Sequence, residues 1–202
     1  AVTGQQGMQH WLETSQAIHE WAVILQDGRR DLSELKARAD SMKDTPQSYS
    51  ALRWVNVATL HMHLGQFQDA LDALARAPAI EAHSETRQFA AERHRLTGEC
   101  LLALEPPDET AAQASFAQAL VISREIGDRR GEALRSWNLG LLFEESDPER
   151  AAELMAVCVA FGQEIGHPAA EADARRVAEV RARAGNEGTR GGGGGGGRGA
   201  LA

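Results

Sequence analysis

Histidine, cysteine and carboxylate residues supply the side chains of several chemistries, but their spacing assembles none of them. His61 and His63 flank Met62, and residues two apart on a helix point roughly 200° away from each other. These two imidazoles therefore cannot bind the same metal ion. His94 lies near Glu92 with no third ligand in view, so we expect no metal site.

Motifs for nucleophilic and phosphate chemistry are also missing. The sequence contains no Cys-x-x-Cys pair, no phosphate-binding glycine loop and no Gly-x-Ser-x-Gly elbow. Cys100 and Cys158 each lie in an apolar helical pattern, which predicts reduced, buried thiols. The adjacent carboxylates Glu144 and Glu145 fit a solvated helix end. We predict no enzyme activity, no catalytic residue and no cofactor.

An internal repeat organises the elements that carry these residues. Residues 124–140 read REIGDRRGEALRSWNLG, and residues 163–172 read QEIGHPAAEA. Glutamate, isoleucine and glycine thus return in the same order about 40 residues later, followed in both copies by Glu-Ala. Self-similarity at such a period is typical of stacked helical arrays.

Periodicity and turn residues predict a helix-turn-helix series. The expected helices cover 7–26, a short helix after Asp31, 50–64, 66–77, 85–104, 110–126, 130–145, 149–165, and Pro168 to about 184. We divide the chain into an N-terminal helix pair over 1–45, which can be read as a degenerate repeat, helical repeats over 46–184, and a flexible Gly-rich tail over 185–202. The last helix is polar, as the exposed end of a stack requires.

Small residues recur where the two helices of each pair should cross. They are Ala58, Gly98 and Gly140 in the first helices and Ala70, Ala112 and Ala151 in the second. This pattern resembles tetratricopeptide repeats, which have a period of ~34 residues. The longer spacing here is similar to the extended repeats of kinesin light chain and of the C-terminal end of bacterial NB-ARC-type signal-transduction ATPases. The resemblance implies an all-α fold, a right-handed α-solenoid of antiparallel helix pairs with a C-terminal capping helix.

In this repeat family the first helix of each pair lines a concave groove that binds protein or peptide ligands. The residues that the resemblance places there are Val55, Thr59, Met62, His63, Glu92, Arg95, Glu99, Leu102, Trp137, Leu141 and Glu144. The family's carboxylate-clamp repeats use Lys and Asn where this chain has Val55 and Thr59, so that clamp is absent. Apolar and acidic residues dominate the set, so we expect a peptide or helix with apolar anchors and some basic charge. Each residue has the alternative role of inter-repeat packing or plain exposure.

Charge and hydropathy limit the class of partner. The formal net charge is −8, which argues against a nucleic-acid backbone as the main partner. No run approaches the ~18 apolar residues of a membrane span, and no secretory signal is visible. We expect a cytoplasmic fragment of a longer protein, since the sequence has no initiator methionine.

These observations favour a protein-protein interaction module that serves as a sensor or scaffold arm of a larger bacterial signalling protein. A free-standing tetratricopeptide-like adaptor that forms a homo-oligomer or assembles a complex is the alternative. A neighbouring ATPase domain would favour the first hypothesis, and a defined oligomer of this chain would favour the second.

Overall fold

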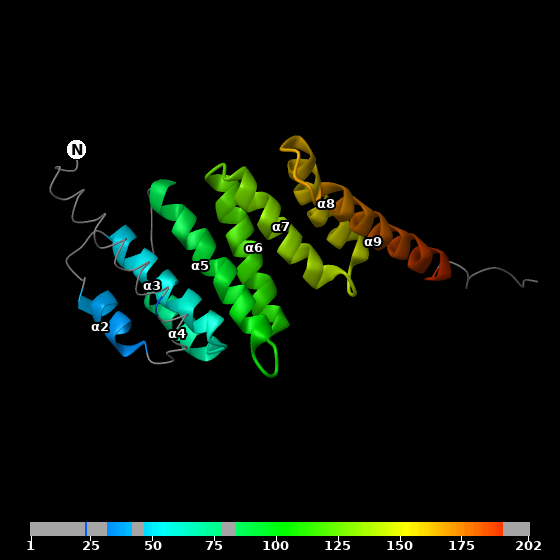
Figure 1. The fold of residues 1–202 in the computed structure, drawn as a ribbon. Coiled ribbons are helices and arrows are strands. Elements are labelled where there is room, and N and C mark those ends of the chain that lie inside the picture. Colours follow the sequence, from blue (N-terminus) through cyan, green and yellow to red (C-terminus); the bar gives the residue numbers. More distant parts are fainter. Residues whose placement is uncertain (1–22, 24–31, 42–46, 78–83, 192–202) are drawn as a thin grey trace, which may run out of the picture. The chain divides into compact units, whose positions relative to one another are not determined.

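All regular structure in the described part of the chain is helical (Figure 1). The computed structural model describes residue 23 and the ranges 32–41, 47–77 and 84–191. The helices are α2 (Ser33–Ser41), α3 (Gln47–His63), α4 (Phe67–Arg76), α5 (Ser84–Ala103), α6 (Glu109–Glu125), α7 (Arg129–Phe143), α8 (Pro148–Glu164) and α9 (Ala170–Gly191). Apart from Val23, the expected helix over 7–26 lies outside the described residues, as does the end of the tail, 192–202.

The predicted helix bounds agree with α3 to α8 to within a few residues. Two ends differ. Helix α3 begins at Gln47, inside the expected connection. Helix α9 begins just after Pro168 and continues to Gly191, beyond the expected end near 184, since each added residue extends the hydrogen-bond ladder.

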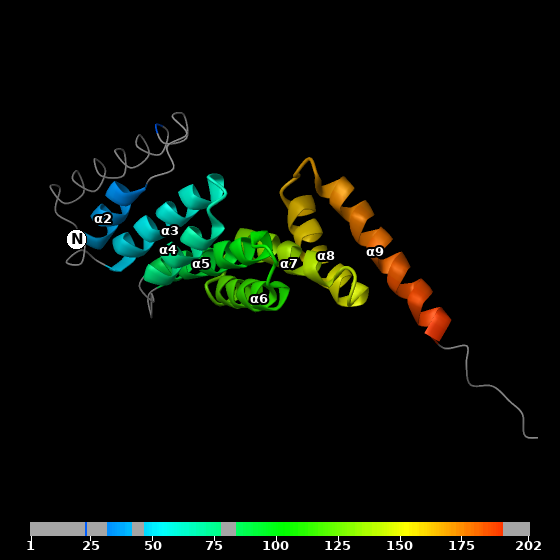
Figure 2. The ribbon, with the colours of Figure 1, turned by 90° about the horizontal axis from the view of Figure 1, so that it is seen from below.

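The helices divide into two compact units, Ala1–Ile80 with α2 to α4 and Glu81–Ala202 with α5 to α9. In the first unit α3 packs against both α2 and α4. In the second unit each helix packs against the next one in chain order, as Figures 1 and 2 show. Phe116, Leu139, Phe143 and Met155 are central members of its hydrophobic core.

Glycine turns explain why an Ile-Gly pair recurs in both copies of the repeated motif. Gly65, Gly127 and Gly166 have φ values of 71°, 70° and 67°, a left-handed conformation that glycine adopts without a Cβ penalty. The amide of Asp128 then donates to the carbonyl of Ser123 at 2.9 Å, which closes a Schellman turn. Equivalent bonds of 2.8 and 2.7 Å close the turns at the other two glycines.

Aspartate begins three of the helices in the second unit. The carboxylates of Asp108, Asp128 and Asp147 each accept a hydrogen bond from the backbone amide three residues later, at 2.9, 2.8 and 3.1 Å. An acceptor at this position satisfies one of the free amides of the first turn. Together, the glycine turns and aspartate caps fix where the helices reverse direction.

Glycine residues allow the close crossings that the sequence predicts. A Cβ added at Gly140 would lie 3.0 Å from the backbone oxygen of Ala151 and 2.6 Å from Cγ of Met155. At Gly98 it would lie 2.8 Å from the ring of Phe116. The small residues at the predicted crossings are all buried. In the second pair the surface facing the glycine is thus a phenyl ring rather than Ala112.

His61 is a buried polar residue of the first unit. Its Nδ1 donates to Oε1 of Gln66 at 2.8 Å, and its Nε2 has no hydrogen-bond partner among the described residues. Burial lowers the pKa of His61 below its ordinary value of 6.5, with the nearby charge of Lys36 acting in the same direction. The Gln66 bond and the charge of Asp69 oppose this shift.

Acid should therefore destabilise the first unit. As the pH falls from about 7.5 to about 5.5, the unfolded chain takes up the His61 proton first, because its pKa is the higher one. The contribution of His61 to stability is fully present above the pKa that this residue has in the unfolded chain, and it declines below that pKa. Urea unfolding followed by helical circular dichroism across this range should show a smaller decline for His61→Phe than for the parent. His63→Gln, at the exposed histidine two residues later, is the matched control, and an unchanged decline in His61→Phe would contradict the assignment.

Candidate protein-binding face

The four groove residues predicted on α3 differ in accessibility. Val55 is buried, and Thr59 donates from Oγ1 to the carbonyl of Val55 at 2.8 Å. Met62 is half-buried and His63 is exposed. Of these four residues, Val55 belongs to the core, Thr59 is half-buried like Met62, and His63 presents the most side-chain surface.

The α5 residues form an ion cluster with α7. Arg95 donates to both oxygens of Glu92, from Nη2 at 2.6 Å and from Nε at 2.9 Å, and also to Glu99. Arg135 of α7 donates to Glu92 at 3.4 Å and lies 3.7 Å from Asp128. In this α5–α7 ion cluster Arg95 is committed to carboxylates of its own helix.

The pKa values of the cluster reflect burial and pairing together. Burial alone would raise the pKa of Glu92, but the Arg95 hydrogen bonds and the charges of Arg95 and Arg135 lower it overall. Burial would lower the pKa of Arg95, and its bonds to Glu92 and Glu99 more than reverse this. For Arg135 burial prevails over the charges of Glu92 and Asp128, and its pKa is lowered. The positive and negative charges of the cluster thus pair with one another, and the cluster is mostly closed to a ligand.

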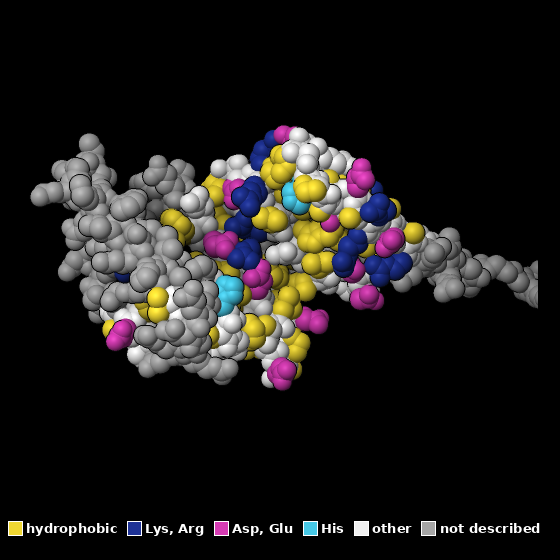
Figure 3. Space-filling view, in the orientation of Figure 1, with side chains coloured by type: hydrophobic (Ala, Val, Ile, Leu, Met, Phe, Trp, Pro, Cys, Tyr) yellow, Lys and Arg dark blue, Asp and Glu magenta, His cyan; other side chains and the backbone are white. Residues whose placement is uncertain are grey.

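An apolar ridge runs along the outward side of α7. Leu134, Trp137 and Leu141 follow at helical spacing, and we name them the α7 ridge. Leu134 is 48% exposed and Leu141 38% exposed, while Trp137 is half-buried and packs against the core. Figure 3 shows hydrophobic side chains between two charged groups on this face of the second unit. Leu102 of α5 is half-buried and packs against the same core, so it adds little free surface.

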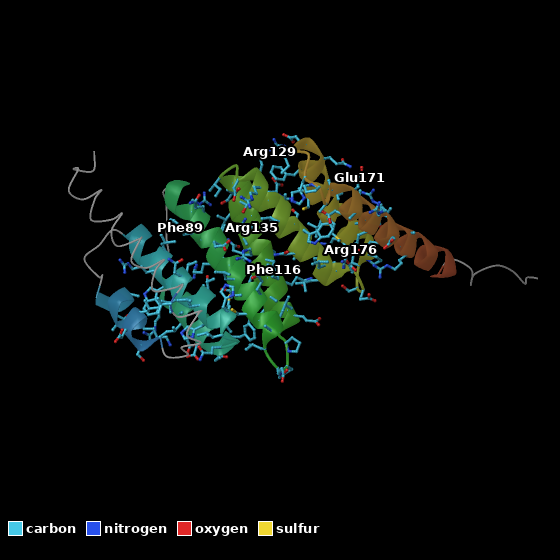
Figure 4. The ribbon with its side chains drawn as sticks, in the orientation of Figure 1. Phe89, Phe116, Arg129, Arg135, Glu171 and Arg176 are labelled. Carbon is cyan, nitrogen blue, oxygen red and sulfur yellow. The ribbon has the colours of Figure 1, made fainter. Side chains whose placement is uncertain are left out.

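A depression of about 590 Å³ lies between α7 and α9. Its lining residues are Glu144, Ala172, Arg175, Arg176, Glu179 and Arg183, and we name it the α9 depression. Glu144 accepts from Nε and Nη2 of Arg176 at 3.0 and 2.8 Å and from Nη2 of Arg183 at 3.2 Å. Figure 4 shows Arg176 on α9 and Arg135 on α7, in separate parts of the face.

The structure changes the expected electrostatics of this face. The three carboxylates predicted to make it acidic, Glu92, Glu99 and Glu144, all pair with arginines of the chain. Other residues of this face were not predicted from the sequence: Leu134, Arg135, Arg175, Arg176 and Arg183. Helical spacing from Leu141 points to Leu134, and helical spacing from Arg176 points to Arg183. The second step requires α9 to be treated as a lining helix as well as a cap.

Within the described ranges, no group of three or more His, Cys, Asp or Glu side chains could hold a metal ion. The same part of the chain contains no helix with the length and apolar character that crossing a membrane requires. Cys100 is buried, and burial raises the pKa of its thiol to about 11.

No protein-family model and no curated protein sequence matches the chain. A solved structure, the crystal structure of the apo form of RapI, matches with a TM-score of 0.70 at 14% sequence identity. The match covers 86% of this chain and 65% of the RapI chain, so the chain spans less than two thirds of RapI. RapI is a tetratricopeptide-like helical repeat protein, and the likeness establishes a helical-repeat solenoid fold. Such folds are suited to protein-protein interaction.

Proposed function

We propose that the second unit binds a peptide or helix of a partner protein on the face formed by the α7 ridge and its charged flanks. The observation that carries this proposal is the exposure of Leu134 and Leu141 at helical spacing. No described element covers them, and grooves of helical repeats are commonly lined by such residues. An apolar strip between polar flanks is also the arrangement that receives an amphipathic helix or an extended peptide with apolar anchors.

A broader proposal is that the chain is a sensor or scaffold arm of a larger cytoplasmic signalling protein. Its support is the resemblance of the REIGDRRGEA and QEIGHPAAEA stretches to repeats of NB-ARC-type ATPases. The full reading frame tests it, because an ATPase domain in the same gene product is the expected finding. A frame that encodes only these repeats would favour the free-standing adaptor.

Peptide binding can be tested without knowing the partner. A random-peptide library displayed on phage is panned against the whole chain, and the enriched peptides are synthesised and titrated. Leu141→Asp should weaken binding roughly tenfold or more, because the apolar centre of an interface contributes most of the affinity. Trp137→Ala is less informative, since Trp137 also packs against the core.

Val121→Asp on α6 is the matched control, because Val121 is an apolar side chain of comparable exposure, 45%, outside the proposed face. It should leave the affinity unchanged. Equal binding by the parent and Leu141→Asp, combined with loss in Val121→Asp, would place the site elsewhere. Failure to enrich any peptide would remove the support for a peptide-binding role.

A further inference from the structure

The α9 depression contains groups that the internal ion pairs leave accessible. Glu144 is only 14% exposed, whereas the side chains of Arg176 and Arg183 are 50% and 47% exposed. A ligand entering from solvent therefore meets guanidinium groups before it meets the Glu144 carboxylate. Its volume of about 590 Å³ also falls in the size range of ordinary ligand sites.

Arginines outnumber carboxylates in the lining of the depression by three to two. One carboxylate, Glu144, is shared between two arginines, so this group retains positive charge. Arg175 also lines the depression, and among the described residues it forms no ion pair or hydrogen bond. A guanidinium offers five N–H donors in a planar fork that matches a carboxylate. Opposing carboxylates are Glu179 in the lining and Glu145, which is 3.6 Å from Arg183 at the solvent-exposed rim.

The α5–α7 ion cluster offers no comparable site. Its Arg95 donates from Nε and Nη2 to Glu92 and from Nη1 to Glu99, and Arg135 is buried. An incoming carboxylate would have to displace these partners in a half-buried environment, which is costly. Of the two charged flanks of the α7 ridge, the α9 side is therefore the one able to receive a charged ligand group.

We propose that the α9 depression binds an acidic side chain, Asp or Glu, of a peptide whose neighbouring apolar side chain rests on the α7 ridge. This rests on the proposed peptide-binding function. Leu141 and Glu144 lie one helical turn apart, so the ridge and the depression are continuous along α7. Arg175 and Arg183 lie on one side of α9, two turns apart, which suits a chain passing along the helix. This proposal differs from the sequence-based expectation of a partner with apolar anchors and some basic charge.

Peptides enriched from the phage library provide the probe. They should carry Asp or Glu beside an apolar residue, and replacing that acid by Asn or Gln should lower the affinity for the whole chain roughly tenfold. Arg175→Gln should cause a similar loss, and the two losses should not add, because each removes the same ion pair. Arg181→Gln, at an exposed arginine of α9 outside the lining, should have no effect.

Glu179→Gln gives a test of opposite sign. An acidic peptide should bind the Glu179→Gln protein more tightly than the parent, because a repelling carboxylate has been removed. The affinity of the acidic peptide should also weaken with added salt. A basic peptide would bind that protein less tightly and the Arg175→Gln protein more tightly. Amidation of the peptide C-terminus should leave the affinity unchanged, since a side-chain carboxylate is the proposed ligand.

The outcomes separate the two proposals. Peptides that need Leu141 but carry no acid, or that bind Arg175→Gln like the parent, would overturn the acidic-anchor proposal and keep the peptide-binding face. Loss of binding on amidation, or competition by a mixed-sequence oligonucleotide that depends on Arg175, would also overturn it. Insensitivity to Leu141→Asp would remove the peptide-binding face itself.

Discussion

Replacing Phe116 with alanine should lower the free energy of unfolding of the second unit by about 3–5 kcal/mol. Phe116 is fully buried on α6 and belongs to the core cluster with Leu120, Leu139 and Phe143. Its loss removes apolar burial and leaves a cavity beside Gly98, where the two backbones are already as close as the ring permits. Urea unfolding followed by helical circular dichroism measures the change.

Val121→Ala on the same helix is the matched control, since Val121 is largely exposed and truncating it should change the free energy of unfolding by less than about 0.5 kcal/mol. If Phe116→Ala changed the free energy of unfolding as little as Val121→Ala, α6 would not bury this ring against α5. Such a result would also remove the physical basis for a small residue at Gly98.

The contact between Gly98 and Phe116 can be measured as a coupling. Gly98→Ala alone should destabilise the unit, because its new methyl group would lie 2.8 Å from the ring. In a Phe116→Leu background the same change should cost less, since the ring is gone. A double-mutant cycle with no coupling between the two positions would contradict the crossing geometry. Gly185→Ala on α9, where an added Cβ would meet no atom within 4 Å, should be neutral or stabilising by up to about 1 kcal/mol.

Local signals explain why the helices could be predicted from the sequence. Gly127 and Gly166 adopt left-handed turns, and Asp128 caps α7, so the repeated motif marks the same turn in each copy. The repeated glutamates also have a physical role. Glu125 and Glu164, at the ends of α6 and α8, pair with arginines in the first helix of the same pair.

The charge distribution of the face could not be predicted in the same way. Glu144 pairs with Arg176 and Arg183, which lie 32 and 39 residues away, and Glu92 meets Arg135 across 43 residues. Spacing within one helix reveals partners three or four residues apart, but contacts between helices depend on the rotation of each helix. Sequence reasoning therefore selected Trp137, Leu141 and Glu144 but not Leu134 or the arginines of α9, and the charge of the face required the helices to be placed.

Exchanging Gly140 for leucine should be the most disruptive single change between α7 and α8, costing about 3 kcal/mol or more. Even the first carbon of the new side chain would lie 2.6 Å from Cγ of Met155 and 3.0 Å from the backbone oxygen of Ala151. The methionine can move, but the backbone oxygen can move only if the two helices separate. Met155→Ala should therefore relieve part of the penalty and leave the rest.

Thermal unfolding by calorimetry measures the effect, and Gly185→Leu serves as the control, because a Cβ added there meets no atom within 4 Å. If Gly140→Leu unfolds like the parent, α7 does not bury this side against α8. The consequence extends to the proposed binding face, since residues of one helix keep fixed angular positions. The burial of Gly140 is what directs Leu134 and Leu141 toward solvent, so a failed prediction here would also remove the argument that the α7 ridge is free to receive a peptide.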